Sequence, residues 1–235
     1  MVPIIAIGNG ISFLVCLALT IKLWKALSTQ KENKFLQNFT YSFSFLSLYF
    51  LILTLPDLLY FLGIKNILFL SAIQITAPIP AAFVIIFQFK VILGIIGKEK
   101  LEKIVMSILI LYLVFSCFSI VLFFENSKLI THGSFFHLTP FSKKPWLRAK
   151  DGIFLLCTLL FLIFFFLRQA VSTKDKFVKK RSYFIGIGFL LLLGAAILNY
   201  IAGSSPTLPP LILASGLASL GMIFIFSGVV TKKKE

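Results

Sequence analysis

The chain has 235 residues, of which 59% are apolar and only 13% are charged, and its mean hydropathy is +1.01. Soluble domains carry about twice that share of charged residues, so the composition excludes an ordinary soluble protein. The net charge of +15 does not indicate nucleic-acid binding, because the basic residues lie in short connections between apolar segments. We therefore expect an integral membrane protein whose first partner is the lipid bilayer.

Seven apolar segments are long enough to cross a hydrocarbon core, which takes about 20 helical residues. Their residues do not alternate as barrel strands do, so we expect α-helices. In chain order, the predicted spans are 3–24, 38–60, 67–96, 103–124, 152–171, 183–203 and 208–230. The third span is too long to be straight, and we expect Pro78 and Pro80 to kink it. The sequence predicts an all-α polytopic membrane protein, with a single seven-helix transmembrane domain over 1–235.

The basic residues also predict the orientation. With the N-terminus outside, 17 Lys and Arg residues fall on the cytoplasmic side and six on the outer side. Because short cytoplasmic loops retain Lys and Arg, we expect the N-terminus outside and the C-terminus in the cytoplasm. The first segment has no basic region before it, which argues against a cleaved signal peptide.

The last two spans are rich in small residues at four-residue spacing, among them Gly188 in the sixth and Ala214, Ala218 and Gly221 in the seventh. Such residues let helix backbones approach closely in lipid. We expect these two spans to pack together within the chain, with a face for a second copy as the alternative.

No set of residues predicts catalysis. The two histidines, His132 and His137, lie in the outer loop at a spacing unsuited to one helix face, and we expect both to be solvated. Cys16, Cys117 and Cys157 all lie in apolar segments, where free Cys acts as a small hydrophobe. We therefore expect no enzymatic activity, no cofactor, no metal site and no disulfide.

Polar residues inside spans are costly and therefore informative. Asp57, Gln74, Asn199 and Tyr200 all fall in the outer leaflet when the spans are run in their predicted directions. We predict that they line a small polar, ligand-binding pocket that opens to the outside. In the alternative, Asp57 is solvated at the interface and the amides bond to neighbouring helices.

Two basic segments flank the bundle. The outer loop 125–151 is basic and aromatic, so it either lies on the membrane or covers the pocket as a lid. The clusters at 174–181 and 232–234 fix the topology, and on the cytoplasmic face they offer a site for anionic lipid.

One stretch carries a family resemblance. Lys179-Lys180-Arg181 precedes a Leu/Gly-rich helix that ends in Asn199-Tyr200-Ile201, and a turn from Gly203 to Pro210 leads to a Ser/Gly/Ala-rich helix. A second stretch adds to it and runs from Ile73-Gln74 through Pro78, Pro80 and Phe83 to Phe87-Gln88-Phe89. Together, the two stretches resemble the seven-helix sensor region that opens many prokaryotic histidine kinases and diguanylate cyclases. The resemblance implies a multi-pass protein of a prokaryotic inner or plasma membrane.

That family continues into a signalling domain, whereas this chain ends at Lys232–Glu235. Any output would then require a signalling partner in the membrane or the cytoplasm. Our leading hypothesis is a receptor-like sensor module without catalytic output of its own. A small-solute transporter of the seven-helix type and a structural or assembly subunit of a membrane complex remain open as alternatives.

Overall fold

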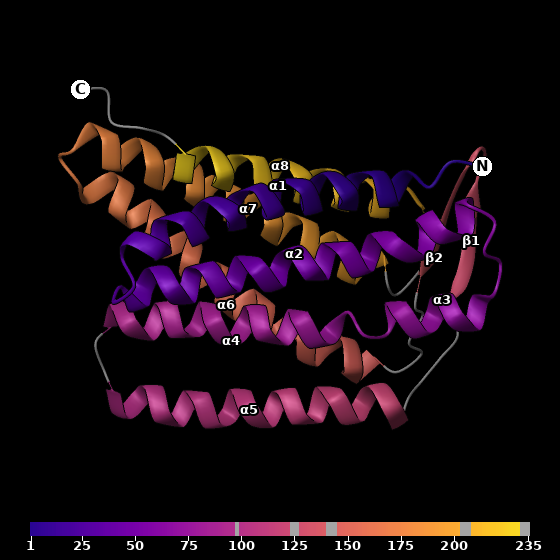
Figure 1. The fold of residues 1–235 in the computed structure, drawn as a ribbon, viewed down its shortest axis with the longest axis horizontal. Coiled ribbons are helices and arrows are strands. Elements are labelled where there is room, and N and C mark those ends of the chain that lie inside the picture. Colours follow the sequence, from indigo (N-terminus) through magenta and orange to yellow (C-terminus); the bar gives the residue numbers. More distant parts are fainter. Residues whose placement is uncertain (97–98, 123–126, 140–144, 203–207, 231–235) are drawn as a thin grey trace.

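The computed structural model of the protein describes residues 1–96, 99–122, 127–139, 145–202 and 208–230. The described elements are α1 (Ile4–Thr29), α2 (Lys34–Phe61), α3 (Ile67–Gln74), α4 (Pro78–Ile96), α5 (Glu99–Leu122), β1 (Lys128–His132), β2 (Phe135–Thr139), α6 (Pro145–Ser172), α7 (Lys176–Ala202) and α8 (Leu208–Val230). The long helices lie side by side, and the two strands stand at one end of them (Figure 1). The sequence did not predict these strands.

Among the described residues, six helical segments are long and apolar enough to cross a membrane. They are Ile4–Thr29, Lys34–Phe61, Ile67–Gly94, Gly152–Ser172, Lys176–Ile201 and Leu208–Val229. Within the described part of α5, Lys103–Phe115 qualifies only as a shorter apolar helix. Most of the described residues are helical, so the fold fits the predicted helical, multi-pass membrane protein.

Local sequence explains where several helices begin. The side chains of Asn33 and Asn66 accept hydrogen bonds from Leu36 N and Phe69 N and so cap α2 and α3. The predicted third span is broken between Gln74 and Pro78, where α3 ends and α4 begins. Proline suits the first position of a helix because its missing N–H would have no helical partner there. The kink therefore lies where the prolines predicted it.

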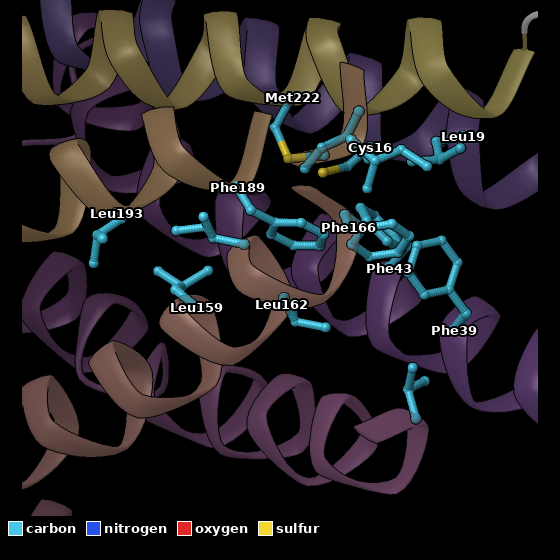
Figure 2. Packing of buried hydrophobic residues seen from close by; sticks show 14 of the residues in the cluster. Cys16, Leu19, Phe39, Phe43, Leu159, Leu162, Phe166, Phe189, Leu193 and Met222 are labelled. Carbon is cyan, nitrogen blue, oxygen red and sulfur yellow. The ribbon is translucent and has the colours of Figure 1, made fainter. Parts of the chain in front are cut away.

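Six helices form a closed ring of neighbours in the order α1, α2, α4, α6, α7, α8 and back to α1. All six contribute to one buried cluster, whose members include Cys16, Leu19, Phe43, Val91, Leu162, Phe166, Phe189 and Met222. Figure 2 shows the labelled members of this cluster gathered in the space between the helices. The hydrophobic core of the bundle is the inside of this ring.

The helix α5 lies outside the ring and packs against α4 (Figure 1). A second, smaller cluster joins the two helices through buried side chains that include Ile85, Leu109 and Tyr112. The Tyr112 ring also lies 4.5 Å from the ring of Phe154 in α6. The opposite face of α5 exposes large apolar side chains such as Leu111 and Phe118, which suits contact with lipid.

The tightest helix contact joins α7 to α8. A Cβ atom added at Gly188 would lie 2.7 Å from the Gly221 carbonyl oxygen, and one added at Gly221 would lie 2.8 Å from the Gly188 oxygen. Real Cβ contacts are essentially never this short, so both positions need glycine. The small residues of the last two spans therefore pack within the chain, as we expected.

Candidate functional site: a hairpin clamped to the helix ends

The strands β1 and β2 form an antiparallel hairpin at the end of the bundle where α1 begins and α2 ends, which we call the hairpin end (Figure 1). His132 pairs with Phe135, so the loop consists of two residues, and its Gly133 has a φ of +58°. Glycine is favoured in such tight loops because it adopts positive φ without steric cost. On the other side of β2, Val2 N donates to Ser134 O (2.7 Å) and Phe136 N donates to Val2 O (3.1 Å).

The carboxylate of Asp57 is fully buried and holds β2. Its Oδ1 accepts a hydrogen bond from Leu138 N at 2.6 Å, and its Oδ2 lies 2.6 Å from His137 Nδ1. An ionised carboxylate only accepts hydrogen bonds, so with Asp57 ionised His137 Nδ1 is the donor in this contact. Burying an ionised group is costly unless it is paired and hydrogen-bonded, and these two donors supply that compensation.

Gln74, the last residue of α3, binds the backbone of the same residue of β2, Leu138. Its Nε2 donates to Leu138 O at 2.5 Å, and its Oε1 accepts from Ser127 Oγ at 2.7 Å. Ser71, one turn earlier, accepts from Ser127 N at 2.7 Å. We call Asp57, Ser71, Gln74, Ser127 and His137 the hairpin clamp, since together they bind the hairpin to α2 and α3.

Aromatic contacts support the hairpin clamp. The ring of Tyr60, near the end of α2, lies 5.2 Å from the ring of buried Phe136. Lys65 closes this end of α2 by donating from Nζ to the Tyr60 carbonyl oxygen (2.6 Å), with Nζ 3.6 Å from the centre of the Tyr60 ring. The hairpin is therefore packed against the helices through an apolar face as well as through polar groups.

The four residues predicted to line a pocket fall into two pairs. Asp57 and Gln74 come together, because both bind the backbone of Leu138. Asn199 is exposed and Tyr200 is 52% exposed, and among the described residues neither joins the hairpin clamp. The described partners of Asp57 and Gln74 belong to the hairpin of the chain itself, and ligand binding at all four positions stays a prediction.

The expectation that His137 is solvated is wrong. Only 7% of the residue is exposed, because its ring is turned onto Asp57, whereas His132 of the same hairpin is exposed. A signal for this contact is present in the sequence, since a carboxylate inside a span requires a donor and His137 lies in the loop on the same side. Ser71 and Ser127 carried no comparable signal.

The described hairpin of the loop 125–151 packs on α1 and α2, and both alternatives for this loop, a lid and a segment on the membrane, stay predictions. Residues 140–144, with the predicted membrane contacts Phe141, Lys143 and Lys144, lie outside the described residues, as do the side chains of Trp146 and Arg148.

Among the described residues, no three His, Cys, Asp or Glu side chains form a group that could hold a metal ion. The site is a buried polar contact between the hairpin and two helices.

The fold and the site define a multi-pass helical membrane protein with a small clamped hairpin at one end. No protein-family model matches the chain, and no curated protein or solved structure matches it either. The resemblance to prokaryotic sensor regions accordingly stays an expectation.

Proposed function

We propose that the chain crosses the membrane seven times, because α5 crosses it in addition to the six segments named above. In this topology the hairpin end lies outside and the C-terminus lies in the cytoplasm. α5 has 24 residues, which corresponds to a length of about 36 Å, enough for a hydrocarbon core of about 30 Å. It also follows α4 at the end of the bundle remote from the hairpin and leads to β1 at the hairpin end (Figure 1). The bias of 17 to six basic residues supports the orientation.

Within that topology, the protein acts as a receptor-like sensor module that passes a signal from its outer face to a partner, without catalytic output of its own. The observation that carries this proposal is the hairpin clamp. One buried carboxylate on α2 and one buried amide on α3 bind the backbone N–H and C=O of the same residue, Leu138, of an extramembrane hairpin. A ligand that competes for these groups, or that moves the hairpin, changes the forces on both helices at once.

A hinge lies directly beside the hairpin clamp. Pro56 is inside α2 and precedes Asp57. Since proline lacks an N–H, the Ile52 carbonyl has no helical donor at this point, and α2 bends there more easily than elsewhere. A displaced hairpin would thus tilt the segment of α2 that bears Asp57, and α2 continues through the bundle to the opposite end.

Co-purification tests the proposal. Tagged chain is cross-linked in membranes of the source organism and purified, and the recovered proteins are quantified. We expect a stoichiometric partner whose recovery changes in Asp57→Asn and not in His132→Ala, a change at an exposed residue of the same hairpin. Size-exclusion chromatography verifies that both variants are folded. Recovery of the chain alone, or of a partner indifferent to Asp57→Asn, would contradict the sensor proposal.

A small-solute transporter is the second candidate, and one observation favours it. Thr20 Oγ1, Ser42 Oγ and Gln88 Oε1 are buried without a hydrogen-bond partner, as judged over the described residues. They belong to α1, α2 and α4 of the ring, and Thr20 lies one turn from the core residues Cys16 and Leu23. Unpartnered polar atoms within a bundle suit a polar solute such as a sugar.

Transport is measured directly in liposomes. A transporter would equilibrate labelled sugars across the membrane, and Gln88→Leu would abolish the flux while Gln30→Leu, at an exposed position, would not. If sugar flux depends on Gln88, the transporter proposal replaces the sensor proposal. If the liposomes that contain the protein stay impermeable to the sugars, the transporter proposal is ruled out.

A further inference from the structure

A hollow of about 320 Å³ lies on α7 at the end of the bundle opposite the hairpin. Its lining consists of Lys176, Lys179, Lys180, Tyr183, Phe184 and Ile187. Counted from Lys176, these positions follow the spacing i, i+3, i+4, i+7, i+8, i+11, so they form one face of the helix. The face is basic over its first turns and apolar beyond them.

The three lysines are exposed, and over the described residues no carboxylate lies within ion-pair distance of them. The adjacent acid, Asp175, is used at the start of α7, where its Oδ1 accepts from Phe177 N (2.8 Å) and Val178 N (3.4 Å). Like charges three or four residues apart repel one another along a helix. An anion in the hollow would relieve this repulsion.

The neighbouring Arg181 has a different role. Its Nε donates to Gly228 O of α8 at 2.9 Å, and its guanidinium carbon lies 5.4 Å from the centre of the Phe177 ring. A cation at carbonyl groups near a helix C-terminus stabilises that end of the helix. The basic cluster 179–181 therefore divides into a structural arginine and lysines that remain available to a ligand.

The apolar part of the face favours a lipid over a free phosphate. From Lys176 to Ile187 the face spans 12 residues, or about 16 Å along the helix. Tyr183 and Ile187 are 38% and 36% exposed, and Lys180 Nζ lies 5.9 Å from the Phe184 ring. A phosphate ion would meet the lysines only, whereas a phospholipid would meet the whole face.

We propose that this hollow binds an anionic phospholipid, with the phosphate at Lys176, Lys179 and Lys180 and an acyl chain along Tyr183, Phe184 and Ile187. In the orientation proposed above, the lipid belongs to the cytoplasmic leaflet. Binding itself depends neither on that orientation nor on the sensor function, because it is a property of the hollow.

The test titrates the purified full chain in a neutral detergent with phosphatidylglycerol and with phosphatidylcholine of the same acyl chains, and measures binding by native mass spectrometry. Each lysine near a lipid surface contributes roughly a fivefold change in affinity, so K176Q/K179Q/K180Q should weaken phosphatidylglycerol binding about 100-fold. The single variant K180Q should weaken it about fivefold, which keeps a readout if the triple variant does not fold.

K25Q/K31Q/K34Q is the matched control, because it removes the same charge from exposed lysines at the same end of the bundle. This control should bind phosphatidylglycerol as the unmodified chain does. Equal binding by K180Q and the unmodified chain, or an equal loss in the control, would overturn the proposal. Glycerol 3-phosphate that competes as well as the lipid would overturn it too, since the hollow would then recognise the phosphate alone.

Discussion

A carboxylate near the C-terminal end of a helix faces the negative end of the helix dipole, and Asp57 lies in that position in α2. It is also fully buried, so both effects make the isolated charge unfavourable. The negative charge of Asp57 is therefore stable there only because Leu138 N and His137 Nδ1, both at 2.6 Å, donate hydrogen bonds to it. Because both donors belong to β2, the stability of α2 in this conformation depends on the position of the hairpin.

The pair can be tested by a double-mutant cycle at residues 57 and 137. His137→Leu leaves a buried carboxylate with one donor fewer and should lower the free energy of unfolding by about 1–3 kcal/mol. Asp57→Leu leaves buried donors unpaired and should cost a similar amount. The double variant should lose less than the two single losses together, because no unpaired charge remains. Thermal unfolding in detergent, followed by circular dichroism, measures all three.

His132→Leu is the control for this cycle. It changes an exposed histidine in the same hairpin, five residues away, and should shift the free energy of unfolding by no more than about 0.5 kcal/mol. Strictly additive losses at 57 and 137 would show that the two side chains do not interact.

At the scale of elements, the contact between α7 and α8 is set by backbone atoms, which cannot rotate away as side chains do. Gly188→Ala would place a Cβ 2.7 Å from Gly221 O and 3.0 Å from Ile225 N. We expect the two helices to move apart at a cost of about 1–3 kcal/mol. The melting temperature in detergent measures this loss.

Gly216→Ala is the matched change on α8. No heavy atom lies within 4 Å of a Cβ built at Gly216. Alanine is the better helix former by about 1 kcal/mol, so this variant should be as stable as the unmodified chain or slightly more so. If both alanine variants behave alike, the close approach of the two helices is not what holds them together.

The hairpin loop makes a third prediction. Gly133 has a φ of +58° and open space around it, so the loss in Gly133→Ala comes from the backbone alone and should be about 1–2 kcal/mol. Gly133→Asn should lose less, since asparagine tolerates positive φ better than alanine. Hydrogen exchange at the Leu138 amide, which Asp57 binds, reports on the strength of hairpin docking. Equal exchange in all three proteins would contradict a strained loop.

The sequence predicted elements better than it predicted contacts. The span 208–230 has the bounds of α8, and the break at Pro78 was predicted, because length and proline chemistry are local properties. Polarity likewise singled out Asp57, Gln74 and Asn199, but it gives the depth of a residue in a span and not its direction around the helix. Asn199 is exposed, and the direction of Asp57 depends on a hairpin 80 residues away.

The hairpin itself was missed for a physical reason. Its two-residue loop at Gly133-Ser134 is a turn signal, but the basic and aromatic composition around it also suits a segment on the membrane surface. Pairing with Val2 and the hairpin clamp decides between the two, and both contacts join residues far apart in the chain.

At the scale of the whole molecule, the proposed seven-span topology predicts on which side each connection lies. A cysteine at Thr131, exposed in β1, and one at Thr173, between α6 and α7, should react with a membrane-impermeant maleimide from opposite sides. Each is introduced after replacing Cys117 and Cys157 by alanine, because both are exposed in the structure. In intact cells, T131C should be labelled, whereas T173C should be labelled only after the membrane is opened.

The position of α5 makes this experiment decisive, because α5 determines whether the chain has returned to the hairpin side before β1. If α5 lay on the membrane surface instead of crossing it, the number of crossings between Thr131 and the N-terminus would change by one. Val2 could then no longer reach β2, although their backbones are hydrogen-bonded at 2.7 and 3.1 Å. A cysteine at Val2 should therefore be labelled from the same side as T131C. Labelling of these two from opposite sides would contradict both the membrane crossing by α5 and the backbone contact between Val2 and β2.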